Sequence, residues 1–343
     1  MPTLKDIAQL TGYSMATVSR VINRQGRVSE KTKQHIEQVA SDIGFTRDNN
    51  KRLKINSGTP SIGVVINRIS SPFYSLLAQN VEDVGREHNR HLMLCTSGYE
   101  AREEQKAIDF LLAHGCRHIV IHSKALSDNV LESICHKHPG VVLIGRNIEA
   151  VRERCVWLDS QSGTYQATQH LINIGHRRIG FINLAFDCDD KHSRLQGYLN
   201  AMKDNDLPVE SGWVQDADWL EVGGRNAARQ LLSQGLPVTA LLAFNDVYAA
   251  SALREFQSRG VQVPAQLSII GFDDVMPQCY FSPALTTLKH PIAAMARKAA
   301  LLALTGDYAR HPQGHCYYPT LIHRESVAPC ADATAERKKI TSK

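Results

Sequence analysis

The first two dozen residues of this 343-residue chain constrain its fold most strongly, because they predict two short helices that meet at a glycine turn. Thr3 is placed to cap the first helix. Its predicted apolar face consists of Leu4, Ile7, Ala8 and Leu10. Gly12 then turns the chain, and Ser14 is placed to cap the second helix. Two helices joined in this way predict a helix-turn-helix unit, whose second helix can lie in the major groove of DNA.

The second helix has an apolar and a polar side. Val18, Val21 and Ile22 recur at helical spacing and are predicted to point into a small core. The other side carries small residues, hydroxyls and a guanidinium, which let a helix approach base edges and phosphates closely. These outward residues are Met15, Ala16, Thr17, Ser19 and Arg20. A third helix, capped by Ser29 and ended by Gly44, completes the unit.

Net charge favours a DNA-binding domain over an ordinary helical bundle with a solvated face. Residues 1–60 hold ten Lys or Arg and five Asp or Glu, whereas the other 283 residues hold 29 of each sign. The whole net charge of +5 therefore lies at the N-terminal end. Polyanion binding is driven by the release of counterions from phosphates, so a basic surplus is useful on a DNA-binding domain. We assign this domain, the head, to residues 1–46.

Four motifs spread over the chain carry a family resemblance. They are Leu4-Lys-Asp-Ile-Ala8, Ala16-Thr-Val-Ser-Arg-Val-Ile-Asn23, Ser268-Ile-Ile-Gly-Phe-Asp-Asp274 and Leu285-Thr-Thr287. With them, nearly the whole chain resembles the LacI/GalR family of bacterial repressors, most closely its galactose repressor and isorepressor type. The predicted DNA contacts of the head are Thr3, Ser14, Met15, Ala16, Thr17, Ser19, Arg20 and Asn23. Among them we expect Met15 and Ala16 to choose the bases, and Thr17, Ser19 and Arg20 to hold the helix on the backbone.

Residues 47–60 are polar, basic and closed by glycine and proline, which predicts a linker. The resemblance implies that part of it forms a hinge helix on operator DNA, with Leu53 wedged into the minor groove beside Lys51 and Arg52. Two departures from the family pattern are Asn50, where a small residue is usual, and about one additional residue before the next strand. A leucine in a flexible linker remains the alternative.

Short β-rich runs alternate with helical stretches through the rest of the chain, which predicts parallel sheets with crossover helices. The runs are 62–66, 91–95, 118–121, 141–144, 179–182, 240–243 and 267–270. They fall into two blocks, each the size of a doubly wound α/β lobe. The resemblance implies a body similar to periplasmic sugar-binding proteins. We place lobe 1 at about 61–160 and 290–319, lobe 2 at about 161–289 and 320–329, and a disordered tail at 330–343.

Ligands of such folds bind at the carboxyl ends of the strands, between the lobes. Residue types that suit a sugar are hydrogen-bonding side chains and flat rings, and several follow predicted strands. The candidate effector residues are Phe73, Arg146, Asp159, Arg194, Trp219, Asn245 and Asp273. The resemblance implies such a role for Arg194, Trp219, Asn245 and Asp273. Alternatively, Asn245 and Asp246 cap a helix that starts near Val247, and Asp274 braces a turn.

Other classes of protein have less support. The eight cysteines are scattered and predict reduced thiols, and the histidine and cysteine clusters near 114–118 and 135–138 match no standard zinc spacing. No apolar run of about 18 residues, signal peptide or nucleotide-binding motif is recognisable. We therefore expect neither cofactor nor metal nor membrane partner, and no enzymatic activity.

Together these features predict a cytoplasmic, homodimeric transcriptional regulator, most simply a repressor of carbohydrate-utilisation genes. It would bind a palindromic operator and respond to a small sugar effector such as galactose. The alternative from another class is a sugar-binding receptor without a gene-regulatory role, and a sugar-metabolising enzyme is a more distant third.

Overall fold

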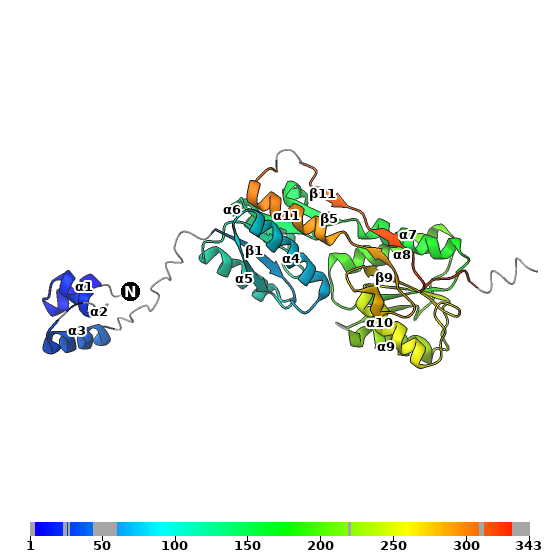
Figure 1. The fold of residues 1–343 in the computed structure, drawn as a ribbon, viewed down its shortest axis with the longest axis horizontal. Coiled ribbons are helices and arrows are strands. Elements are labelled where there is room, and N and C mark those ends of the chain that lie inside the picture. The colour runs from blue at the N-terminus through cyan, green and yellow to red at the C-terminus, as the bar shows by residue number, and fades with distance from the viewer. Residues whose placement is uncertain are drawn as a thin grey trace, which may run out of the picture. The chain divides into compact units, whose positions relative to one another are not determined.

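The computed structural model describes residues 4–22, 26, 28–43, 60–218, 221–308 and 312–330. The chain divides into two compact units, residues 1–59 and 60–343, which contain the head and the body (Figure 1). Some predicted features lie outside the described residues, namely Thr3, Asn23, Lys51, Arg52, Leu53, Trp219 and the tail from 331 onward. No helix within the described ranges has the length and apolar character needed to cross a bilayer.

The described part of the head consists of α1 (Leu4–Thr11), α2 (Met15–Ile22) and α3 (Glu30–Asp42). Its small core consists of Ile7, Val18, Val21, Ile36 and Ala40, as the helical spacing predicts. The Ser14 and Ser29 hydroxyls accept hydrogen bonds from the backbone N–H groups of Thr17 and Thr32, at 3.2 and 3.3 Å. The placement of Leu10 in the core was wrong. Leu10 is 61% exposed, because it lies off the stripe that Leu4, Ile7 and Ala8 form around α1.

Lobe 1 is built on a sheet of parallel strands in the order β11-β5-β4-β3-β1-β2. The strands are β1 (Ser61–Ile66), β2 (His91–Thr96), β3 (Ile119–Ile121), β4 (Val141–Ile144), β5 (Cys155–Leu158) and β11 (His315–Tyr317). One core packs α4 (Pro72–Glu87) and α11 (Ile292–Thr305) on the sheet. A second core includes α5 (Ala101–Ala113), α6 (Asp128–Lys137) and the short η1 helix (Glu149–Arg154).

Lobe 2 repeats the arrangement with the sheet order β12-β10-β9-β8-β6-β7, in which β12 alone is antiparallel. Its strands are β6 (Ile179–Leu184), β7 (Val214–Ala217), β8 (Ala240–Ala243), β9 (Ser268–Asp273), β10 (Thr286–Lys289) and β12 (Thr320–Ile322). The helices form two packed pairs, α7 (Ser160–Asn173) with α8 (Asp189–Asp204), and α9 (Glu221–Ser233) with α10 (Asp246–Ser258). The short η2 helix (Gln278–Tyr280) precedes β10.

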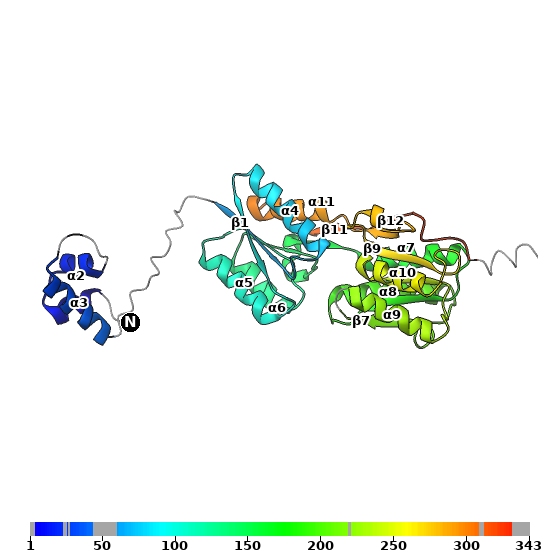
Figure 2. The same ribbon diagram turned by 60° about the horizontal axis from the view of Figure 1, so that its bottom comes forward.

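The chain passes between the two sheets where β5 leads to α7, where β10 leads to α11 and where β11 leads to β12 (Figure 2). Gly197 lets α8 approach α7 closely, because a Cβ there would lie 2.2 Å from the Gln161 carbonyl oxygen. These features confirm the predicted fold class, a helical head followed by two doubly wound lobes. Because the loops after the parallel strands of both lobes line a common pocket, the cleft between the lobes is the place to look for a ligand.

Candidate functional site

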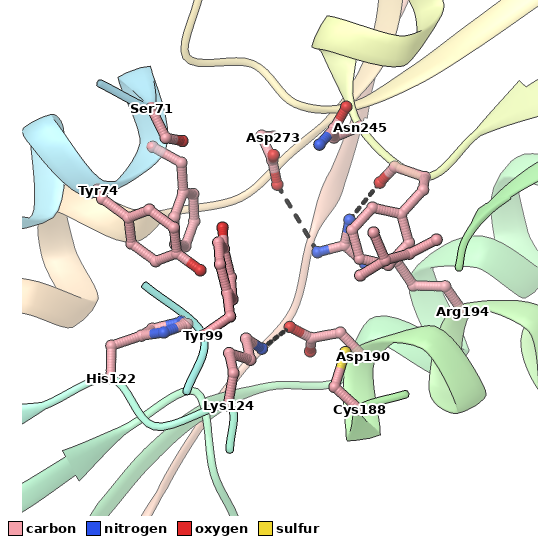
Figure 3. A pocket seen from close by; sticks show the side chains of 13 residues that line it. Ser71, Tyr74, Tyr99, His122, Lys124, Cys188, Asp190, Arg194, Asn245 and Asp273 are labelled. Atoms are coloured by element: carbon pink, nitrogen blue, oxygen red, sulfur yellow. Dashed lines mark hydrogen bonds and ion pairs between the residues drawn. The ribbon is translucent and has the colours of Figure 1, made fainter. Parts of the chain in front are cut away.

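A pocket lies between the lobes, lined by loops that follow the carboxyl ends of the strands (Figure 3). It contains about 490 Å³ of space without protein atoms, part of it continuous with solvent. Lobe 1 contributes Ser71, Phe73, Tyr74, Tyr99, His122 and Lys124, and lobe 2 contributes Leu184, Cys188, Asp190, Arg194, Phe244, Asn245 and Asp273.

The lobe 1 wall is a cluster of rings. Phe73 packs edge to face on Tyr74 at 5.3 Å between ring centroids, and Tyr74 packs in the same way on His122 at 5.0 Å. Asn67 donates a hydrogen bond of 2.9 Å to the Tyr74 hydroxyl. Burial, followed by the nearby Lys124, holds the pKa of His122 well below its usual value, so the imidazole is neutral. Apart from Lys124, this wall presents flat, uncharged surface with a few polar edges.

The lobe 2 wall is built around Arg194. Its guanidinium carbon lies 4.3 Å from the ring centroid of Phe244 and 3.6 Å from that of Phe272. It also donates a hydrogen bond to the Phe244 carbonyl, and one of its nitrogens lies 3.7 Å from a carboxylate oxygen of Asp273. These contacts leave the guanidinium few alternative positions, because its planar shape must satisfy both rings and the carbonyl at once.

Arg194 and Asp273 are buried, yet each has a polar atom without a hydrogen bond; the Asp273 atom lies 3.7 Å from both Arg194 and Nδ1 of His290. Arg194 Nε and Asp273 Oδ1 have no hydrogen-bond partner among the described residues. Asp273 also has a positive φ of 107°, which is strained for a residue with a Cβ. Buried polar atoms without partners cost free energy, and a ligand that donates to the carboxylate and accepts from the guanidinium removes that cost.

A third feature of the pocket is an ion pair between the lobes. Lys124, in the loop after β3, donates to the carboxylate of Asp190 at the start of α8 (Figure 3). Burial alone would raise the pKa of Asp190, but Lys124 and Arg194 outweigh it and hold that pKa well below its usual value. The described pocket lining thus holds two cations and two carboxylates. Its charges are balanced.

Four of the predicted effector residues line the pocket: Phe73, Arg194, Asn245 and Asp273. Asn245 also caps α10, because its side-chain oxygen accepts a 2.9 Å hydrogen bond from the backbone N–H of Tyr248. Capping and pocket lining are therefore compatible at this position.

Two other predicted residues do not line the pocket. Asp159 caps α7 by accepting a 2.9 Å hydrogen bond from the backbone N–H of Ser162. Arg146 is buried and makes ion pairs with Asp128 and Asp189. Both residues follow strands, as their prediction required, but their side chains are engaged by neighbouring helices instead of pointing into the cavity.

Sequence analysis overlooked several residues of the lining. The most important are Tyr99, His122, Lys124, Cys188 and Asp190. His122 and Lys124 directly follow β3, and the rule that ligands meet the carboxyl ends of strands would have found them. Asp190 lies in the first turn of a helix and does not follow a strand. The only sequence signal for it was therefore the preference of carboxylates for a helix N-terminus.

The outer side of α2 in the head has the character expected of a recognition helix. Met15, Ala16 and Arg20 are exposed, Thr17 and Ser19 are half-buried, and Val18 and Val21 are buried. Of the side chains predicted to contact DNA, Met15, Ala16 and Arg20 therefore lie on the side that faces away from the core.

Comparison with known proteins extends over both units. Residues 3–48 match the family described as bacterial regulatory proteins of the lacI family, and residues 168–327 match a periplasmic binding protein-like domain. The HTH-type transcriptional regulator GalS of Salmonella typhimurium is 36% identical over 330 residues, which cover 96% of this chain and 97% of GalS.

Solved structures that are similar to the chain include the following two. The crystal structure of the Escherichia coli transcriptional repressor AscG has 29% identity and a TM-score of 0.70, covering 79% of this chain and 100% of that one. A complex of the transcriptional regulator CelR with cellobiose has 26% identity and a TM-score of 0.67, covering 95% and 100% of the two chains.

Proposed function

The chain belongs to the LacI family of bacterial regulatory proteins, and from this membership we propose that it represses carbohydrate-utilisation genes. It is a DNA-binding transcriptional regulator and not an enzyme. The alternative of a sugar receptor without a regulatory role is wrong, because the similarity to GalS includes the head as well as the body. A protein that acts on the chromosome of a bacterium works in the cytoplasm, which is where we place it.

For DNA recognition we propose a homodimer on a palindromic operator. Two heads related by a two-fold axis present two α2 helices to successive major grooves, about 34 Å apart. Met15 and Ala16 are exposed at the start of α2, where a recognition helix approaches base edges. Arg20, at the other end of the helix, is assigned to a phosphate.

For the effector we propose an uncharged sugar bound in the pocket between the lobes. The observation that carries this proposal is the buried Arg194–Asp273 pair, in which Nε of Arg194 and Oδ1 of Asp273 make no hydrogen bond with the described residues. A hydroxyl can donate to the carboxylate and accept from the guanidinium, so adjacent ring hydroxyls match both atoms. The rings of Phe73 and Tyr74 offer the flat surface that a sugar ring covers. The cellobiose bound by the related CelR is consistent with this class of ligand.

The balanced charges of the lining argue for a neutral sugar over a phosphorylated or acidic one. Each carboxylate in the pocket has a cation beside it, Lys124 for Asp190 and Arg194 for Asp273. An added anion would meet Arg194 and Lys124 already neutralised and would lie close to Asp190 and Asp273, in a site of low dielectric.

The test is calorimetric titration of the full chain with galactose and other neutral monosaccharides, with galacturonate and a sugar phosphate as charged controls. We expect one neutral sugar to bind and its charged derivatives to bind at least tenfold more weakly. Gel-shift assays with an operator selected from random-sequence DNA should then show that this sugar changes operator affinity. Tighter binding of the charged sugars, or a sugar that binds without any effect on DNA binding, would contradict the proposal.

A further inference from the structure

The start of α8 carries two adjacent carboxylates, and each is paired with a cation from the other lobe. Asp190 receives Lys124 from the loop after β3. A carboxylate oxygen of Asp189 lies 3.2 Å from Nε of Arg146, which follows β4, and the two form an ion pair without a hydrogen bond. Just before these residues, the ring of Phe186 packs against Tyr99 of lobe 1, with 5.7 Å between ring centroids. Three separate loops of lobe 1 thus meet one short segment of lobe 2, residues 186–190.

The two ion pairs differ in their relation to the pocket. Lys124 and Asp190 are part of its lining, whereas Arg146 and Asp189 are not. Arg146 is nearly buried, with 9% of its side chain exposed, and it also pairs with Asp128 of its own lobe. Its second partner, Asp189, has 63% of its side chain exposed. The Arg146–Asp189 pair therefore acts between the lobes without touching a bound ligand.

We propose that Arg146 and Asp189 form an ionic clasp that favours the closed arrangement of the lobes and thereby raises effector affinity from outside the pocket. The clasp rests on the effector site assigned above. A ligand that binds the closed arrangement has an apparent Kd equal to its intrinsic Kd divided by the closed fraction of the protein. Any contact that increases the closed fraction therefore strengthens binding, even when it makes no contact with the ligand.

The expected size of the effect follows from the exposure of Asp189. Ion pairs with a solvated partner are worth little in water and are screened by salt, so loss of the clasp should weaken effector binding about two- to fivefold. An uncharged sugar makes no ion pair of its own. Salt can then weaken its binding only through charged contacts of the protein. A smaller salt dependence of sugar binding in a variant therefore indicates loss of an ion pair, whereas loss of packing alone would leave the salt dependence unchanged.

The variant Asp189→Asn removes the clasp charge, and Asp187→Asn is its matched control. Asp187 lies in the same acidic segment and loses the same charge, but it pairs with His192 of its own lobe at 2.6 Å, and its side chain is 86% exposed. A second variant, Asp189→Lys, places a cation opposite Arg146. Both altered positions are on the surface of the body, and circular dichroism with thermal melting verifies that each of the three variants is folded.

The first measurement is the Kd of the full-length variants for the neutral sugar between 50 and 500 mM salt, in the range over which exposed charges become screened. We expect Asp189→Asn to weaken binding two- to fivefold at low salt and to reduce its salt dependence, Asp189→Lys to weaken it further, and Asp187→Asn to behave as the unaltered protein. Equal affinities and equal salt dependence for Asp189→Asn and Asp187→Asn would overturn the clasp.

The second measurement separates the clasp from the effector assignment, because it needs no ligand. Hydrogen exchange of the sugar-free protein reports opening of the lobes at the amides after β3 and β4, in residues 122–128 and 145–150. We expect Asp189→Asn to accelerate exchange in these lobe 1 segments as well as around residue 189. Acceleration confined to lobe 2 would mean a merely local role and would overturn the clasp. If no sugar binds the unaltered protein, the proposed function fails while this exchange test still decides the clasp.

Discussion

At the scale of single residues, Arg194 is the side chain whose surroundings specify its chemistry most completely. It stacks between Phe244 and Phe272, donates to the Phe244 carbonyl and faces Asp273. Replacement by lysine keeps the charge but loses the planar stack and the fork of donors. We expect Arg194→Lys to weaken sugar binding at least tenfold, since hydrogen bonds to charged groups are worth about 1.5–3 kcal/mol.

The control for this variant is Arg297→Lys, because Arg297 lies on α11 and pairs with the partly exposed Glu87. It should leave the Kd unchanged, and both variants should bind operator as the unaltered protein does. Titration calorimetry measures the difference. If Arg194→Lys retains full affinity, the sugar does not use the guanidinium.

Asp246 is a residue whose charge should affect stability near neutral pH. It is buried at the start of α10 and accepts hydrogen bonds from the Thr287 hydroxyl at 2.6 Å and the Asp274 backbone N–H at 2.8 Å. Burial, followed by the charge of Asp273, raises its pKa to about 8. The folded protein therefore holds a proton at neutral pH that the unfolded chain, with a pKa near 4, has released.

The sign of the pH effect follows from that difference. Because the folded state binds more protons than the unfolded state between about pH 4 and 8, this group makes the free energy of unfolding fall as the pH rises through that window. In Asp246→Asn the amide can still accept from Asp274 and donate to the Thr287 oxygen. Urea denaturation at pH 6, 7 and 8.5 should show a smaller fall for the variant. Parallel pH profiles would exclude ionisation of Asp246 from this range.

Position after a strand led to Phe73, and family resemblance together with residue type led to Arg194, Asn245 and Asp273. All four line the pocket, and their contact with an effector stays a prediction. Lys124 follows a strand and could have been found by that rule, but its ion pair with Asp190 joins segments 66 residues apart and leaves no local pattern. Arg146 was assigned to the effector because it follows a predicted strand, and the sequence pattern does not show that it pairs with Asp189 of the other lobe.

At the scale of elements, the recognition helix α2 makes the most direct prediction. Arg20 is exposed in its last turn, where it is available for a phosphate. Each phosphate that a protein neutralises adds about one unit to the slope of log K against log salt concentration. We expect Arg20→Ala to reduce the slope by about two, one for each head of the proposed dimer, for specific and random DNA alike. The control is Lys33→Ala on α3, where Lys33 pairs with Glu30. An unchanged slope in Arg20→Ala would remove Arg20 from the phosphate contact.

The elements themselves were predictable to the extent that they are buried. All seven predicted apolar runs overlap strands of the structure, and the predicted α/β class is confirmed. The strands outside those seven runs are β5, β7, β10, β11 and β12. Three of them are sheet edges, which need no apolar run because they lack neighbours on one side. In β10 the buried Thr286 and Thr287 use their hydroxyls in hydrogen bonds, so burial there leaves no apolar signal.

At the scale of the whole molecule, the central question is how the pocket and the operator communicate. The chain divides into two units, residues 1–59 and 60–343, and the predicted linker between the head and the body is residues 47–60. We expect closure of the lobes to change how this segment orders on the operator, with Leu53 at its centre. Coupling of this kind is a free energy shared by two ligands, so each must change the affinity of the other by the same factor.

This reciprocity gives a prediction in two halves. The factor by which saturating sugar changes the Kd for operator should equal the factor by which saturating operator changes the Kd for sugar, whichever direction the change takes. Gel shifts measure the first factor and calorimetry the second. The variant Leu53→Ala should weaken operator binding, leave the Kd for sugar in the absence of DNA nearly intact, and bring both factors closer to one. If Leu53→Ala weakens sugar and operator binding equally, Leu53 acts through the stability of the body and not through the hinge. If both factors keep their full size in Leu53→Ala, communication between pocket and operator uses a route other than this leucine.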